Sequence, residues 1–227
     1  MEHGLVQAAL RAEVAAFTGA VAGFAEHDFR ASTRCVPWTV AELLIHVRDA
    51  VNRLPSMLAD LPPARADVSA AGYYQPDVRF SVATNADRVM IAQKGAREFA
   101  TGRALGASFT AACEELLAAV ASEPAGRLVR TRHGDAMSLT DFLATRVVEL
   151  GLHGLDVSDA LGRPAWLSPQ AARVLELLLL SGEDPDRARP DGWDRLDFLR
   201  KATGRAGLSP IEAAELDRDG VRHLTLG

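Results

Sequence analysis

The stretch VVELGLHGLD, residues 147 to 156, bears most directly on the fold and function of this chain. Apolar residues dominate it, as in a buried helix, yet it carries Glu149, His153 and Asp156 at spacings of four and three residues. These spacings place the three polar side chains on or near one helix face. Unpaired polar groups on an apolar face are unfavourable. The three residues therefore either satisfy one another in a core or hold a ligand.

The helix that contains this stretch has clear start and stop signals. Ser138 is a typical N-cap residue, and Asp141 places a negative charge in the first turn. The apolar pattern continues to about Leu161 and meets Gly162 and Pro164, which end helices. The sequence therefore predicts one long helix from about residue 139 to 161.

Three further helical segments precede it. Apolar periodicity predicts a helix over 4–26 and another from Thr39 to just before residue 61, opened by a capping box with Glu42. A third region covers 82–121, where three glycines leave open whether it is one helix or two. Four segments of this length predict an all-α four-helix bundle.

The connecting and C-terminal segments are less regular. Residues 62–80 read as a long loop, and 126–137 as a short extended excursion with a turn at 133–135. After residue 164 the sequence predicts three shorter helices and a tail, 217–227, with a turn and a short strand. We therefore expect a bundle over 1–164 and a small α(+β) C-terminal region over 165–227.

Composition narrows the functional class. The chain has 227 residues, 48% of them hydrophobic, and a formal net charge of −5. It has no arginine- or lysine-dense block, and phosphate neutralisation requires a basic surface, so nucleic acid is not an expected partner.

The cysteines and the N-terminus bear on location. Cys35 and Cys113 are far apart in sequence and form no CxxC pair, which fits a reducing cytoplasm without a disulfide framework. The N-terminus has no basic segment ahead of an apolar core, unlike a signal peptide. No apolar run approaches the ~18–20 residues that a membrane span requires, so we expect a cytoplasmic protein.

The polar residues of two helices form a possible metal-ligand set. If His46 of the second helix faces Glu149 and His153, two imidazoles and one carboxylate meet inside the bundle. Three protein ligands with an open position suit catalytic zinc, and the same set suits non-haem Fe(II), with nickel or manganese also possible. Asp49 and Asp156 are then candidate outer hydrogen-bond acceptors.

Each candidate has a structural alternative. Glu149 could pair with Arg146 on the same helix, and His46 could be a satisfied core histidine. Cys35 could be a nucleophile, but no histidine near it in sequence supports activation, so a small buried side chain is the preferred interpretation. Arg205 could be exposed or could present a cation to an anionic substrate.

Two motifs resemble a known family. WTVAELLIHVRD at 38–49 and HGDAMSLTDFLATRVVELGLHGLDVSDALGRP at 133–164 are similar to the paired motifs of the mycothiol-dependent maleylpyruvate isomerase family, within the DinB-like metalloenzyme superfamily. The resemblance extends over about residues 1–165. It implies a DinB-like four-helix bundle that binds zinc, or another divalent metal, through His46, Glu149 and His153.

The resemblance also implies a chemistry. The family uses the low-molecular-weight thiol mycothiol as cosubstrate, in the cis–trans isomerisation of maleylpyruvate or in thiol transfer. Its larger C-terminal domain supplies an arginine near the substrate, whereas only residues 165–227 follow the bundle here. ATGRAG at 202–207 resembles the family's glycine–arginine segment, which makes Arg205 the candidate catalytic arginine.

Three functions follow as hypotheses. The first is a metal- and mycothiol-dependent transferase or isomerase that acts on a small electrophilic substrate. The second is a metal-dependent hydrolase, which needs a general base such as Asp49 or Asp156. The third is a bundle that binds a metal or small ligand without catalysis.

Overall fold

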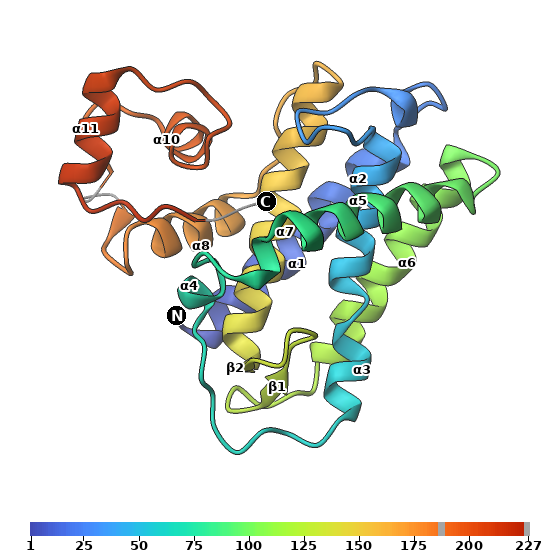
Figure 1. Cartoon of the computed structure of the whole chain (residues 1–227), viewed down its shortest axis with the longest axis horizontal. Helices are drawn as coiled ribbons and strands as arrows, with labels where there is room; N and C mark the ends of the chain where they lie inside the picture. The colour runs from blue at the N-terminus through green and yellow to red at the C-terminus, as the bar shows by residue number, and fades with distance from the viewer. Residues whose placement is uncertain (186–188, 225–227) are drawn as a thin grey trace.

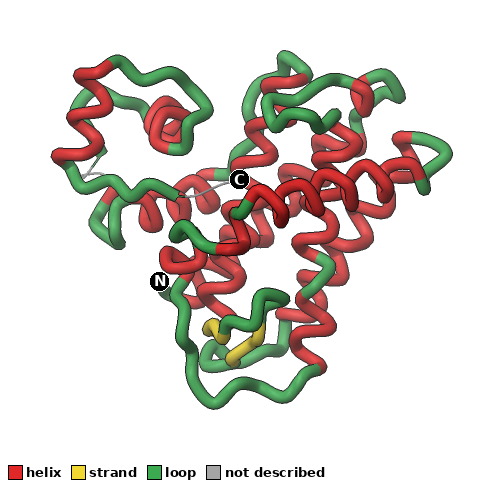
Figure 2. Tube along the Cα trace, in the orientation of Figure 1, coloured by secondary structure: helices red, strands yellow, loops and turns green. Residues whose placement is uncertain are grey.

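A computed structural model gives the structure of residues 1–185 and 189–224. The chain is mainly helical (Figures 1 and 2). Its elements are α1 (His3–Ala22), η1 (Asp28–Arg30), α2 (Val40–Val51), α3 (Leu54–Ala59), α4 (Ala70–Tyr73), η2 (Val78–Phe80), α5 (Val82–Arg97), α6 (Gly102–Val120), β1 (Leu128–Arg130), β2 (Ala136–Ser138), α7 (Leu139–Ala160), α8 (Pro169–Leu179), α10 (Arg195–Ala202) and α11 (Pro210–Arg218).

Four helices close into a ring around the main core, which confirms the all-α bundle. Helix α1 packs against α6 and α7, and α2 packs against the same two helices from the other side. Leu10, Phe17, Leu43, Phe109 and Leu143 have no exposed surface. Each such side chain stabilises the fold by roughly 1.5–3 kcal/mol relative to full exposure. Helix α7 is buried along nearly its whole length, so polar residues on it face the interior.

The predicted second helix is wrong at its C-terminal end. The capping box of Thr39 and Glu42 is present, and α2 begins at Val40. The helix ends at Val51, however, and α3 begins at Leu54 with Pro55 in its first turn. Proline has no backbone N–H and its ring clashes with the carbonyl four residues earlier, so one continuous helix is unfavourable here.

Residues 82–121 form two helices. Helix α6 belongs to the ring, whereas α5 lies on α2, outside it (Figure 1). Gly102 begins α6 where a Cβ atom would lie 2.2 Å from the ring of Phe29. The glycine therefore permits a close approach between the start of α6 and η1.

The prediction of a loop over 62–80 is only partly right, whereas the predicted extended segment with a turn is present. The predicted loop over 62–80 contains two short helices, α4 and η2. Strands β1 and β2 pair antiparallel with Val129 opposite Met137, and Gly134 adopts φ of +93° in the predicted turn. In the described chain these strands form one two-stranded sheet.

The C-terminal helices lie at one side of the bundle (Figure 1). Helix α8 is capped by Ser168 and packs against α1 and α7, and α10 packs on α8. The predicted strand in the tail is absent from residues 221–224, while 225–227 lie outside the described residues. The division of the chain between residues 164 and 165 stays a prediction.

Helix α1 corrects the expectation about apolar runs. By length and composition it could cross a membrane, with a mean hydropathy of 1.3 over 18 residues. Its side chains Val6, Leu10 and Phe17 are completely buried, and the helix packs against α6, α7 and α8. A core helix of a bundle meets the same criterion, and α1 has that position here.

Candidate metal centre

Helices α2 and α7 bring the three predicted ligands together. Nε2 of His46 and Nε2 of His153 each lie 3.4 Å from Oε2 of Glu149. The potential ligand atoms of all three residues lie within 4.8 Å of one another. Glu149 and His153 meet because they are one turn apart on α7. His46 meets them because α2 packs against α7.

Aromatic packing orients His46. The ring of Trp38, in the loop before α2, stacks on the imidazole with 4.7 Å between ring centroids and 30° between planes. The two imidazoles lie edge to face, with centroids 5.2 Å apart. His46 is therefore held between an indole and the second histidine.

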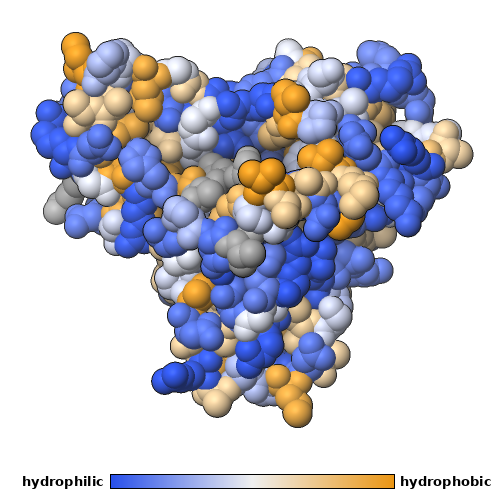
Figure 3. Space-filling view, viewed as in Figure 1, coloured by the Kyte–Doolittle hydropathy of each residue, from blue (hydrophilic) through white to orange (hydrophobic). Residues whose placement is uncertain are grey.

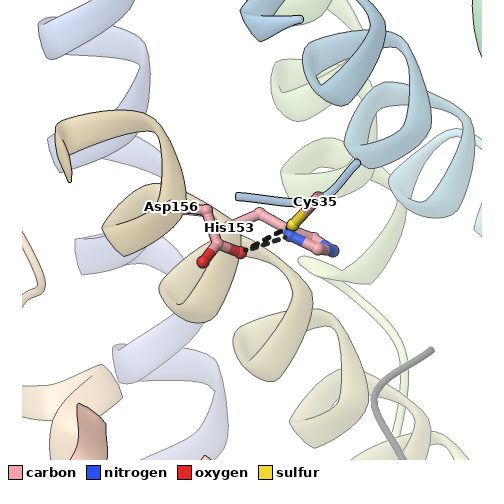
Figure 4. Close-up of side chains that lie close together, drawn as sticks. All are labelled: Cys35, His153 and Asp156. Carbon is pink, nitrogen blue, oxygen red and sulfur yellow. Dashed lines mark hydrogen bonds and ion pairs between the residues drawn. The ribbon is translucent and has the colours of Figure 1, made fainter. Parts of the chain in front are cut away.

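Asp156 connects His153 to two other parts of the chain, and Figure 4 shows its contacts with His153 and Cys35. Its Oδ2 lies 3.0 Å from Nδ1 of His153 and accepts a hydrogen bond from Sγ of Cys35 at 3.3 Å. The same oxygen accepts one from Nη2 of Arg205 at 2.7 Å. A carboxylate at Nδ1 keeps a proton on that nitrogen and fixes the ring, so Nε2, which faces Glu149, is the nitrogen that could bind a cation after losing its own proton.

Burial and pairing act on these groups in opposite directions. Burial disfavours the charged form of Glu149, but hydrogen bonds from His153 and His46 outweigh it and hold the carboxyl pKa well below its usual range. Burial likewise opposes charge on Asp156, while His153 and Arg205 lower its pKa. Burial lowers the pKa of His46, which favours the neutral imidazole that can donate to a cation.

The pKa of His153 shifts the other way. Burial would lower it, but the hydrogen bonds with Asp156, Cys35 and Glu149 raise it well above the usual value. These directions describe the three residues without a cation. With one, the ligands must be neutral imidazoles and a carboxylate, since metal binding displaces protons.

The donor set fits a divalent metal ion. Two imidazole nitrogens and one carboxylate oxygen converge from two helices, and an outer carboxylate orients one of the imidazoles. This is the ligand chemistry of catalytic zinc with an open position, and also of a two-histidine, one-carboxylate iron site. The fit rests on donor type and convergence.

The cluster opens into a cavity of about 520 Å³. The wall of the cavity includes all three residues of the cluster, Arg205 and aromatic side chains of the 73–80 segment. Polar residues cover most of the face of the molecule in Figure 3, and apolar residues lie there in small separate groups. The cavity is within the ~300–1,000 Å³ range of small-molecule sites.

The other predicted residues lie as follows. Arg205 lines the cavity, but its guanidinium is bound to Asp156 and to the carbonyl of Leu152. Asp49 also lines the cavity, and its Oδ1 accepts two hydrogen bonds from Arg48. Asp156 contacts a candidate ligand directly, whereas Asp49 binds a neighbouring arginine.

The structural alternative for Glu149 is not formed. Arg146 donates from Nη1 to the carbonyl of Ala50 at 2.8 Å and from its other nitrogens to Oγ1 of Thr145. Among the described residues it makes no ion pair with Glu149. The polar partners of Glu149 are the two histidines.

Sequence reasoning missed the position of Cys35. Its thiol lies in the cluster with His153 and Asp156, although 118 residues separate it from His153. Spacing along one helix could not reveal that contact. The available signal was the position of Cys35 just before Trp38 and α2, because that loop must reach the same end of the bundle as His46.

The fold and the cluster define a helical bundle with a two-histidine, one-carboxylate centre at the meeting of two helices. Residues 10–158 match the family described as mycothiol maleylpyruvate isomerase N-terminal domain. The match covers more than half of the chain, so the chain belongs to this family. No curated protein matches the chain.

One solved structure is similar to the chain. It is the crystal structure of the mycothiol-dependent maleylpyruvate isomerase, at 14% sequence identity and a TM-score of 0.49. The similarity covers 80% of this chain and 72% of that one.

Proposed function

We propose that the protein is a metal- and mycothiol-dependent transferase or isomerase that acts on a small electrophilic substrate in the cytoplasm. The observation that supports this most directly is the convergence of His46, Glu149 and His153 within 4.8 Å at the wall of a 520 Å³ cavity. Membership of the mycothiol maleylpyruvate isomerase N-terminal domain family supports the choice of thiol.

The three residues would hold zinc or another divalent cation. Such a cation, when bound, favours the thiolate form of a thiol at its open position. The chain supplies the donors from two packed helices, α2 and α7, so their separation depends on core packing rather than on a loop.

The surrounding residues would orient the ligands. Asp156 accepts from Nδ1 of His153 and so leaves Nε2 for the cation. Arg205 neutralises the buried charge of Asp156 and connects α7 to the segment after α10. Arg205 would thus act on the centre through Asp156, which is a narrower role than direct contact with substrate.

The reaction would use the sulfur of the cosubstrate as nucleophile. In isomerisation, the thiolate adds to a carbon–carbon double bond, rotation occurs about the resulting single bond, and elimination of the thiolate restores the double bond. In transfer, the sulfur–carbon bond is retained, the neighbouring negatively charged carbon takes up a proton, and the adduct leaves. Arginines that line the cavity would bind a negatively charged group of the substrate.

A hydrolase is less well supported. It needs a free general base beside the centre. Oδ2 of Asp156 is engaged by His153, Cys35 and Arg205, and Oδ1 of Asp49 is engaged by Arg48. No contact in the described chain favours metal-activated water over a thiol.

Elemental analysis tests the proposal first. The wild-type protein, purified without added metal, should carry about one zinc or other divalent ion per chain, as expected for a three-ligand site. His46→Ala and Glu149→Ala should lose it and keep the helical circular dichroism spectrum. His27→Ala is the matched control, since this exposed histidine lies outside the cluster.

Thiol dependence is the second measurement. Turnover of a maleyl-type electrophile should require both mycothiol and the bound metal. Activity that persists after chelation, or a wild type that takes up neither zinc, nickel nor iron, would contradict the proposal.

A further inference from the structure

Three arginines from separate parts of the chain line the cavity. Arg53 precedes α3, Arg88 lies on α5, and Arg132 lies in the turn between β1 and β2. All three line the same cavity as the metal centre. They come from three separate elements, so the gathering is a property of the fold and not of a local basic sequence.

These guanidinium groups lack a carboxylate partner. Arg88 donates to Oδ1 of Asn85 at 2.6 Å, and Nε of Arg132 lies 3.0 Å from Nε2 of His133. In residues 1–185 and 189–224, none of the three forms an ion pair with an acidic side chain. Burial, followed by repulsion from Arg132, lowers the pKa of both Arg53 and Arg88.

Other arginines of the cavity are already bound. Arg205 pairs with Asp156, and Arg146 donates to the carbonyl of Ala50. The group of Arg53, Arg88 and Arg132, called here the arginine wall, differs from Arg205 in having no ion pair with an acid in the described chain, since Asp49 acts on Arg53 and Glu149 acts on Arg88 only at longer range. A negatively charged ligand would relieve the repulsion among its members.

Apolar side chains line the cavity together with the arginine wall. Met57 lies one turn after Arg53, and Tyr74 and Phe142 are almost completely buried. Phe80 also lines the cavity and is half-buried, and the guanidinium carbon of Arg88 lies 5.6 Å from the centre of its ring. Such a surface favours a ligand with an apolar or aromatic body over one that is polar throughout.

Arg88 of the arginine wall is near enough to His46 and Glu149 to interact electrostatically with both. Asp156, Arg205 and Cys35 contact the other ligand, His153. The three candidate ligands therefore have different neighbours in the cavity wall, with Arg88 near His46 and Glu149 and with Asp156 bound to His153.

We propose that the second substrate is an amphiphilic carboxylate, with its carboxylate bound by Arg53, Arg88 and Arg132 and an apolar, ring-sized body against Met57, Tyr74 and Phe142. This inference rests on the proposed function and specifies its substrate class. It places the carboxylate on the bundle rather than at Arg205.

Ligand binding tests the inference without turnover. The probes are cinnamate, which has a ring and one carboxylate, its neutral amide cinnamamide, and maleate, which has two carboxylates and no apolar body. Titration calorimetry on the full-length protein should give an affinity for cinnamate at least tenfold higher than for either other probe. Added salt should weaken cinnamate binding and leave cinnamamide binding unchanged.

Substitutions locate the site. Arg88→Gln and Arg132→Gln should each weaken cinnamate binding about tenfold, because each removes one charge-assisted contact. Arg97→Gln, at the end of the same helix α5 and outside the cavity, should have no effect. Since Arg132 is exposed, its substitution keeps the test valid if Arg88→Gln folds poorly.

Three results would overturn the inference. Equal binding of cinnamate and cinnamamide would exclude the carboxylate site, and tighter binding of maleate would exclude the apolar body. Unchanged cinnamate binding in both arginine variants would exclude the arginine wall. A protein that carries metal and binds thiol but not cinnamate would retain the proposed function, whereas cinnamate binding without metal uptake would defeat that function alone.

Discussion

Two buried carboxyl groups of the bundle behave in opposite ways. Glu149 on α7 has two imidazole partners, and its pKa lies well below the usual range. Glu13 on α1 is fully buried, and burial raises its pKa to about 7, although a backbone hydrogen bond from Ser168 acts against this shift. Burial penalises both groups, so the partners decide which carboxyl is charged.

The surroundings of Glu13 explain its weaker pairing. Oε2 accepts from the backbone N–H of Ser168 at 2.8 Å, while Oε1 and the nearby Nε1 of Trp166 are buried without a hydrogen-bond partner. No cationic side chain is among the causes of its pKa shift. Glu13 is therefore suited to join α1 to the start of α8, and Glu149 is suited to hold a cation.

Replacing each carboxyl group by an amide tests the difference between Glu149 and Glu13 most directly. Glu149→Gln should lower metal affinity by more than the ~10- to 100-fold typical of losing an outer partner, because it removes a direct donor. Glu13→Gln should leave metal content unchanged. Elemental analysis and zinc titration of both variants measure the difference. Equal metal loss in the two variants would show that Glu149 has no special role.

The pH dependence of the free energy of unfolding tests the raised pKa of Glu13. The pKa of Glu13 rises from 4.5 to about 7 on folding. The contribution of Glu13 to the free energy of unfolding is therefore fully present below pH 4.5 and is lost as pH rises through about 7. A shift of this size corresponds to about 3 kcal/mol. Glu13→Gln should remove that loss, so the free energy of unfolding of the variant should rise relative to that of the wild type between pH 4.5 and 8.

Urea denaturation at several pH values gives the required free energies of unfolding. Other groups titrate over the same range, so the quantity of interest is the difference between wild type and variant at each pH. Glu115→Gln, on the exposed face of α6, serves as the control. A constant difference between wild type and Glu13→Gln from pH 4.5 to 8 would contradict a raised pKa.

The outer partner of the proposed metal centre should affect metal affinity less than a proposed ligand does. Asp156→Asn keeps the shape but loses the charge that orients His153 and pairs with Arg205. Metal affinity should fall roughly 10- to 100-fold. Asp49→Asn should change it little, since Asp49 contacts Arg48. Competition with a chelator measures both, and a larger effect from Asp49 would reverse their assigned roles.

Local sequence signals predicted much of the fold. Capping residues at Thr39, Ser138 and Ser168 located helix starts because each satisfies backbone N–H groups of its own first turn. The break before Pro55 was also present in the sequence. The sequence did not show that α5 packs outside the ring, because whether α5 or α6 belongs to the ring depends on which faces of α2 and α6 meet.

The contacts of the candidate site likewise include some that local spacing predicts and others that it does not. Glu149 and His153 share a helix face, so their proximity follows from spacing. The contacts of Cys35 and Arg205 with Asp156 join segments more than 40 residues apart, and the arginine wall joins three elements. Such contacts depend on chain topology. The residues alone left open whether Arg205 is exposed or faces an anionic substrate, and the family resemblance made it the candidate catalytic arginine.

The smallest expected effect concerns Gly154, which lies between the two carboxyl sites. A Cβ atom there would lie 3.0 Å from Nε1 of Trp166 and 3.7 Å from Oε1 of Glu13. Gly154→Ala gains up to about 1 kcal/mol in helix propensity and loses about 1–3 kcal/mol to overpacking. We expect a net destabilisation of about 1 kcal/mol, measured by urea denaturation, with unchanged zinc affinity.

His153 is the adjacent residue, but its side chain points to Glu149 and Asp156. A fall in zinc affinity would therefore mean that packing around Glu13 and Trp166 controls the position of His153, and that the two carboxyl sites are one coupled unit.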